Sequence, residues 1–235
     1  MSVKSKKTVL KKTEINKKKS LQKNGTETLV ERVYAELEEM IVTLKLKPGQ
    51  IISESDLGEM LHVSRTPIGD ALQRLAREGL VNILPRRGIV VTEINVSDQL
   101  KLLEFRRSVS KFAAASAAKR AKDDERIKME TIAKQLLEAV KKKDGRSLLQ
   151  ADKAFHDHLS VCIKNDYASR ALNSLDALPR RFWFVHHQNQ DDEESGRLHA
   201  QLALAIAKGD EVAAEIASDR LFDSLEKFVH QTLNR

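Results

Sequence analysis

SESDLGEMLHVSRTPIGDALQRLAREGLVNILPRRGIVVT, residues 53–92, is the stretch that decides the fold of the first part of this 235-residue chain. Residues 53–56 offer a capping box, which predicts a short helix through Leu61. Ser64 can cap a second helix after a tight turn, and Gly79 ends that helix. Two helices separated by so short a turn are typical of a helix-turn-helix.

The sequence on either side of these two helices completes a small domain. Apolar residues recur every three or four positions over residues 26–45, which predicts an amphipathic helix that stops at Pro48-Gly49. Residues 80–84 and 89–92 are rich in β-branched side chains and flank a turn at residues 85–88, so they predict a hairpin.

Three helices followed by a hairpin make a winged helix-turn-helix, which we place at residues 26–95. The second helix of the pair would enter the major groove of DNA, and arginines at the hairpin tip could enter the minor groove. A winged helix used only for protein contacts is the alternative. The residues we expect to contact DNA are Ser55, Ser64, Arg65, Thr66, Arg74, Arg86, Arg87 and Gly88.

The positive charge of the chain is concentrated at its beginning. The whole sequence has a net charge of +7, and residues 1–25 contribute +8, from nine lysines and one acid. We expect this segment to be a disordered basic tail. It could follow DNA phosphates without sequence preference, or it could be a solubilising leader.

Cysteine and hydropathy exclude several classes of protein. The chain has one cysteine, Cys162, so a disulfide scaffold and a cysteine-based zinc finger are both excluded. No run of apolar residues approaches the roughly 18 that a membrane span needs. No apolar stretch follows the basic N-terminus, so we expect no secretory signal, no membrane partner and a cytoplasmic protein.

Helical periodicity dominates residues 96–235. Six segments separated by short breaks predict an all-helical antiparallel bundle, so the fold class is mainly α. Pro179 is expected to kink the fourth segment. The predicted segments are 97–121, 123–143, 147–164, 167–188, 192–208 and 211–233.

Four polar residues interrupt the apolar stripes of these helices. Asp152 and His156 are four residues apart and therefore on one face, while His199 and Arg106 occupy the apolar stripes of two other helices. Buried polar groups need partners, so we expect the four to converge in the bundle. An Asp and two His can bind a divalent metal, but a local Asp–His hydrogen bond and a satisfied core histidine explain the same residues.

Two groups of motifs resemble the GntR family of bacterial transcription regulators, in its FadR-like branch with an FCD effector domain. The first group runs from LKPG through SESDL, VSRTP and ALQRL to EGLV and RG within residues 46–88. The second comprises DKAFH at 152–156, Asn165, His199 and AIAKGD at 205–210. Together these motifs cover nearly the whole chain after the tail.

The resemblance implies a dimeric regulator that binds a pseudo-palindromic DNA operator under the control of a small effector. Relatives with this signature bind a metal at the floor of the effector pocket, and small organic acids are common effectors. On this basis the metal ligands would be Asp152, His156 and His199, with Zn, Ni or Mn as the ion. The effector would contact Arg106, His156 and His199.

The sequence departs from the family pattern at three places. Gly69-Asp70 stands where the recognition helix usually has Arg-Glu, so one DNA-contacting arginine is absent, and Gly weakens the helix by up to about 1 kcal/mol relative to Ala. Leu221 stands where the family has its last metal-binding His. Ser110 replaces a Glu usually found four residues after Arg106. A metal-free pocket that binds an anion directly therefore competes with the metal site.

Arg180 and Arg181 adjoin a run of aromatic residues. We expect the aromatic side chains to pack in the core or at a dimer contact, and either arginine could reach the effector. The sequence does not orient them.

Two further functions account for part of the pattern. A metal-dependent hydrolase could use Asp152, His156 and His199 to activate water, but no second carboxylate shares a matching face. A non-specific architectural DNA-binding protein would explain the basic tail and leave the polar residues of the bundle unexplained. We therefore expect a regulator and not an enzyme.

Overall fold

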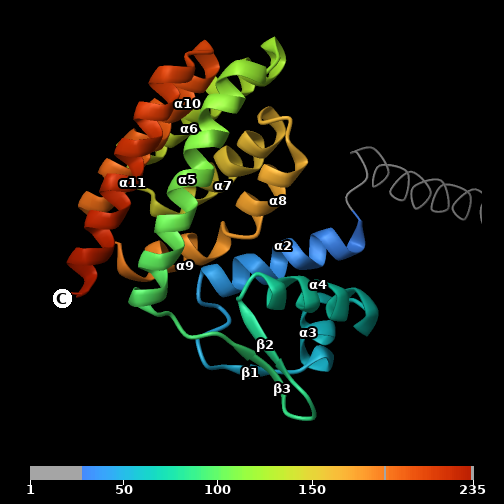
Figure 1. The fold of residues 1–235 in the computed structure, drawn as a ribbon. Helices are drawn as coiled ribbons and strands as arrows, with labels where there is room; N and C mark the ends of the chain where they lie inside the picture. The colour runs from blue at the N-terminus through green and yellow to red at the C-terminus, as the bar shows by residue number, and fades with distance from the viewer. Residues whose placement is uncertain (1–27, 188, 234–235) are drawn as a thin grey trace, which may run out of the picture.

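The computed structural model describes residues 28–187 and 189–233 and consists of two packed parts (Figure 1). One is a winged-helix unit, residues 28–91, and the other is a helical bundle that begins at residue 96. Residues 92–95 connect them. The predicted basic tail at residues 1–25 lies outside the described residues.

The three predicted helices of the winged-helix unit are present as α2 (Leu29–Val42), α3 (Glu54–Leu61) and α4 (Arg65–Arg77). The turn between α3 and α4 begins at His62, whose φ of 55° is left-handed and so ends α3 sharply. Ser64 lies at the N-cap of α4 but makes no side-chain capping hydrogen bond, contrary to the sequence-based expectation. Its hydroxyl group is exposed.

The predicted hairpin is also present, with β1 added as a third strand. Strand β3 (Gly88–Val91) lies between β1 (Ile51–Ile52) and β2 (Val81–Leu84), and both pairings are antiparallel. Leu84 pairs with Gly88, so the tip of the wing consists of the three residues between them. The apolar pair Ile51-Ile52 thus connects the segment between α2 and α3 to the wing.

The helical bundle contains one more break than the sequence predicts. The expected helix at 167–188 is divided into α8 and α9, and Pro179 lies in the first turn of α9, where its missing N–H causes no kink. The helices of the bundle are α5 (Val96–Arg120), α6 (Asp123–Lys142), α7 (Gly145–Cys162), α8 (Asp166–Asn173), α9 (Ala177–His186), α10 (Asn189–Lys208) and α11 (Glu211–Leu233).

Small side chains allow the helices of the bundle to approach closely. Four alanines of α5 are completely buried, where α5 packs against α10 and α11: Ala113, Ala114, Ala117 and Ala118. Helix α9 lies at the edge of the bundle and packs against α2 of the winged-helix unit (Figure 1). This contact joins the two parts.

None of the helices in the described ranges is both long enough and apolar enough to cross a membrane.

Two glycines within helices allow a matched test of packing. At Gly196 a Cβ atom would overlap with Val140 Cγ2, whereas at Gly69 the nearest atom, Glu54 Oε1, would be 3.5 Å away. We expect Gly196→Ala to lower the free energy of unfolding by about 1–3 kcal/mol through overpacking. Gly69→Ala should raise it by up to about 1 kcal/mol through helix propensity. Urea unfolding measures both, and equal effects would contradict this account of the α10 packing.

Candidate functional site

The exposed start of α4 presents polar side chains around one corner of the winged-helix unit. Ser64, Arg65 and Thr66 are all exposed, and Arg65 Nη2 donates a hydrogen bond of 3.4 Å to Ser55 Oγ. A helix N-terminus with exposed hydroxyl and guanidinium groups can contact phosphates and base edges. The structure therefore brings together four of the residues that the sequence indicated.

The wing presents a second basic surface. Arg86 and Arg87 are exposed at its tip, and Arg86 has a φ of 62°. Gly88 follows with a φ of 96°, and a Cβ there would lie 3.1 Å from the carbonyl oxygen of Ile52. Gly88 thus shapes the turn that holds the arginines outward, because a larger residue would be strained there.

Arg74 differs from the other predicted DNA-contacting residues. Its Nε donates to Glu78 Oε1 at 3.0 Å, and its guanidinium lies 3.6 Å from the centre of the Tyr34 ring. Its guanidinium is therefore already paired with groups of the winged-helix unit. DNA contact by Arg74 stays a prediction.

Sequence reasoning missed two exposed residues of α4. Gln73 and Arg77 are exposed and follow Thr66 at helical spacing, so they extend the same face. Gln can bond adenine with both amide atoms and Arg can bond guanine or phosphate. Positions 66, 73 and 77 are spaced by seven and four residues, which places them on one helix face. This spacing could have identified Gln73 and Arg77 from the sequence.

A cavity, partly open to solvent, lies in the helical bundle. Its walls combine apolar side chains with a few polar groups, as ligand pockets usually do. The lining residues are Arg106, Leu148, Leu149, Asp152, His156, Pro179, Arg180, Trp183, Ser195, His199 and Leu225.

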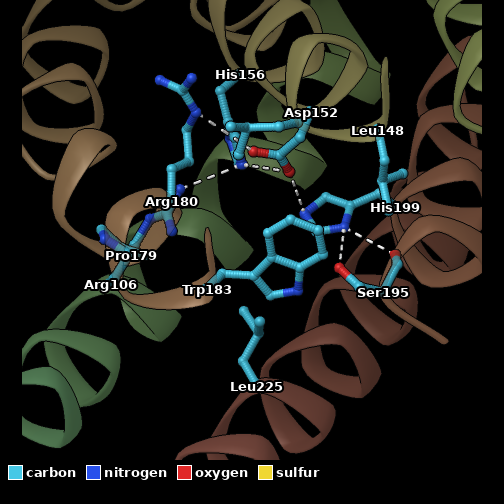
Figure 2. Close-up of a pocket in the computed structure, with 11 residues that line it drawn as sticks. Arg106, Leu148, Asp152, His156, Pro179, Arg180, Trp183, Ser195, His199 and Leu225 are labelled. Carbon is cyan, nitrogen blue, oxygen red and sulfur yellow. Dashed lines mark hydrogen bonds and ion pairs between the residues drawn. The ribbon is translucent and has the colours of Figure 1, made fainter. Parts of the chain in front are cut away.

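The predicted polar residues converge in this cavity. Asp152 lies between the two imidazoles, with its Oδ1 3.0 Å from His199 Nε2 and 3.7 Å from His156 Nε2 (Figure 2). The ligand atoms of the three residues all lie within 4.8 Å of one another. Arg106 joins them, because its Nη2 lies 3.2 Å from His156 Nε2.

The two imidazoles have opposite protonation preferences. Burial, reinforced by the charge of Arg106, lowers the pKa of His156 to about 3 although Asp152 opposes the shift, so this ring is neutral at pH 7. Burial also opposes charge on His199, but the ion pair and hydrogen bond with Asp152 outweigh it and raise the His199 pKa. Both ring nitrogens of His199 face oxygens, since Nδ1 lies 2.9 Å from the Ser195 carbonyl oxygen.

A second layer of charge surrounds the cluster. The sequence indicated that Arg180 could reach the effector, whereas sequence reasoning missed Asp176. Asp176 is buried and accepts a hydrogen bond of 3.1 Å from Arg106 Nη2. Arg180 is also buried, with its Nη1 3.6 Å from Asp176 Oδ2 and its Nε 3.9 Å from Asp152 Oδ2. Asp176 lies in the break between α8 and α9, which the continuous helical pattern concealed.

Three buried N–H groups at the wall of the cavity find no hydrogen-bond acceptor among the described residues: Arg106 Nε, Arg180 Nε and Trp183 Nε1. Such groups are costly unless a water or ligand supplies an acceptor. The cavity wall therefore offers donors to a water or to a ligand that carries acceptor oxygens. Arg181, by contrast, points to the connecting segment, where its Nη1 donates to Thr92 Oγ1 at 3.1 Å.

The donor set fits a divalent cation in part. One carboxylate and two imidazoles are suitable ligands, and Ser195 orients His199 from behind as an outer-shell carbonyl does in metal sites. No fourth ligand comes from α11: Leu221 is buried with 2% exposure, and Leu225 lines the cavity one turn further on. Arg106 also competes for the lone pair of His156.

Two family matches cover most of the chain. Residues 29–91 match "Bacterial regulatory proteins, gntR family", and residues 101–224 match the FCD domain. The chain therefore belongs to the GntR family of bacterial regulators with an FCD domain. These proteins are transcriptional regulators and not enzymes, so the hydrolase interpretation is not supported.

Individual relatives agree with this assignment. The chain is 27% identical over 192 residues to the Nta operon transcriptional regulator of Aminobacter aminovorans, covering 81% of this chain and 91% of that protein. It is 25% identical over 211 residues to the HTH-type transcriptional repressor RspR of Escherichia coli, covering 89% and 92%. The solved structure of E. coli McbR/YncC has a similar fold, with a TM-score of 0.76 and 17% identity over 89% of this chain and all of that one.

Arg65 tests the DNA interface. We expect Arg65→Ala to weaken binding to a duplex that the wild-type protein selects from a random-sequence pool by about 1–3 kcal/mol, because a bidentate contact is lost. Fluorescence anisotropy measures the affinity, and circular dichroism checks the fold. Arg170→Ala, an exposed arginine on α8, is the control and should bind normally. Equal affinity of Arg65→Ala and wild type would remove Arg65 from the interface.

Proposed function

We propose that the cavity binds a small carboxylate effector that controls the affinity of this regulator for its operator. The observation that carries the proposal is the set of buried N–H donors at the cavity wall that lack acceptors, two of them on arginines. A carboxylate offers two acceptor oxygens and matches the guanidinium fork. Arg106, His156 and His199 would contact it, as the sequence indicated, and Arg180 joins them.

The apolar part of the cavity supports an effector with a hydrocarbon body. Leu148, Leu149, Pro179 and Leu225 line the wall, and the Trp183 ring lies beside His199 (Figure 2). Burial of apolar surface on these side chains would add affinity, while the arginines fix the orientation of the carboxylate.

We also propose that one divalent cation, such as Zn, Ni or Mn, binds to Asp152, His156 and His199. Support comes from the proximity of the three ligand atoms and the orientation of His199 by Ser195. When bound, the cation would supply a positive charge at the site, and a carboxylate of the effector could coordinate it.

On DNA, the regulator is proposed to act as a homodimer on a pseudo-palindromic operator, with residues 26–95 as its DNA-binding domain and residues 96–235 for dimerisation and effector binding. Phe105 and Phe112, 56% and 48% exposed, are two turns apart on one face of α5. Exposed apolar surface of this kind favours association between protein chains. One protomer per selected duplex in analytical ultracentrifugation would contradict the dimer.

Arg106 tests the effector site. Among benzoate, succinate and citrate, we expect at least one to raise the melting temperature of the wild-type protein, as ligand linkage requires. Arg106→Gln should abolish the shift, and Arg106→Lys, which keeps the charge without the fork, should retain a reduced one. Scanning fluorimetry gives the readout.

Arg197→Gln is the matched control for this experiment, because Arg197 is 61% exposed on α10 and pairs only with Glu193 among the described residues. It should respond like the wild type. A full response in Arg106→Gln would show that the carboxylate binds elsewhere.

Elemental analysis of the purified, untagged protein tests the metal. We expect about one divalent cation per chain after incubation with zinc, nickel or manganese salts, and its loss in the Asp152→Ala/His156→Ala double variant. Asp157→Ala removes a carboxylate of the same helix that is 61% exposed, and it should retain the metal. A metal-free wild-type protein would contradict the cation site, and the cavity would then bind an anion directly.

A further inference from the structure

Arg180 makes a buried ion pair with the winged-helix unit. Its Nη1 donates to Glu38 Oε1 at 2.6 Å, and both side chains are only 3% exposed. Glu38 belongs to α2 and Arg180 to α9, so this contact lies at the junction of the two parts of the molecule (Figure 1).

The same guanidinium also borders the effector cavity. Arg180 lines the cavity, and its Nε has no hydrogen-bond acceptor although Asp152 Oδ2 lies 3.9 Å away. Arg180 therefore contacts the DNA-binding part through Nη1 and borders the proposed ligand site with Nε. A ligand carboxylate that engages Arg180 would approach the group that holds Glu38.

The acids within the bundle each have another cationic partner. Asp176 has Arg106 at 3.1 Å, and Asp152 has His199 at 3.0 Å. Both acids are fixed by helices of the bundle. Neither depends on Arg180 alone, and neither can move away from Arg180 without rearrangement of the bundle.

Glu38 also has a second cationic partner, but it lies on α2 of the winged-helix unit and not on the bundle. Besides Arg180, the ion pair that the described chain gives it is with Lys153, whose Nζ is 3.5 Å away and whose side chain is 32% exposed. A buried carboxylate that loses its main partner carries a large desolvation penalty. Glu38 can regain hydration only if α2 moves away from α9.

Such a movement is compatible with the connection between the two parts. The winged-helix unit joins the bundle through residues 92–95, and Arg181 holds the first of these by donating from Nη1 to Thr92 Oγ1. Thr92 in turn donates from Oγ1 to the carbonyl oxygen of Gly79. Thr92 thus links the bundle to the winged-helix unit, and a rigid-body rotation of the unit about this point would move α2 away from α9.

We propose that a carboxylate effector and Glu38 compete for Arg180, so that effector binding releases the winged-helix unit from the bundle. This inference rests on the proposed effector site and adds the means by which occupancy reaches the DNA-binding part. The effector brings a negative charge into a cluster whose cations are already paired. The acid that gives way is Glu38, because it alone of the three lies on the movable unit.

Competition has a reciprocal consequence. If effector binding weakens the docked arrangement, docking weakens effector binding by the same factor. Removal of the Glu38 charge should therefore tighten carboxylate binding even though Glu38 does not line the cavity. A residue that served only to stabilise the fold would not produce this gain.

Glu38→Gln is the variant that tests the competition, with Glu39→Gln as its matched control. Glu39 is the next residue of α2, but its carboxylate is 36% exposed and lies 3.8 Å from Arg180 Nη2. By calorimetry with benzoate, succinate and citrate, we expect Glu38→Gln to bind the active carboxylate about tenfold more tightly than the wild type, within the usual range of coupling between sites. Glu39→Gln should bind like the wild type.

Spin labels measure the release itself, without reference to affinity. Met60→Cys on α3 and Ile127→Cys on α6 are 53% and 66% exposed, whereas the native Cys162 is fully buried and should not react. We expect double electron–electron resonance to give one narrow distance distribution between the two parts in the wild-type background. Glu38→Gln should broaden it, as should the active carboxylate added to the wild type, and Glu39→Gln should leave it narrow.

The outcomes separate this inference from the proposed effector site. Suppose that no carboxylate binds while Glu38→Gln still broadens the distribution. The proposed effector class is then wrong, and the Glu38–Arg180 ion pair holds the two parts together without a competing carboxylate. The competition is overturned. If a carboxylate binds wild type and Glu38→Gln equally and the distribution stays narrow, the effector site stands and the competition is again overturned.

Discussion

The burial of the Arg180 guanidinium is the constraint on which the arrangement of this molecule depends. A cation with 3% exposure needs acidic partners, and it finds them on α2, on α7 and at the start of α9. These elements are far apart in the sequence and belong to both parts of the structure. The docking of the winged-helix unit on the bundle and the composition of the effector cavity are therefore two results of one charge requirement.

The cavity contains polar groups that a stable core would avoid. An aspartate, two histidines and two arginines face one another within a bundle whose helices are otherwise packed through alanine, leucine and phenylalanine. Such a cluster contributes little net stability, because desolvation offsets much of the attraction between charges. The cluster is understandable as the proposed ligand site, in which a ligand would supply acceptors to Arg106, Arg180 and Trp183. The FCD family match agrees with this interpretation.

In the winged-helix unit, the arginines differ in their exposure and in their partners, which the sequence alone does not reveal. Arg65 and Arg86 are exposed at the start of α4 and at the wing tip, whereas Arg74 is paired with Glu78 and packed on Tyr34. Gly69-Asp70 leaves the middle of α4 without its usual basic side chain. The exposed side chains available for the proposed base recognition therefore lie at the two ends of the α4 face and on the wing.

The sequence by itself determined the winged helix, the helical character of the second part and the convergence of Asp152, His156, His199 and Arg106. It could do so because helical period, turn residues and polar interruptions of apolar stripes are local signals. Only the tertiary structure decided that α8 and α9 are separate, that Asp176 and Arg180 complete the cavity, and that Glu38 reaches Arg180 from the other part of the molecule. Pairing across 142 residues of sequence leaves no periodic trace, because it depends on how finished helices pack.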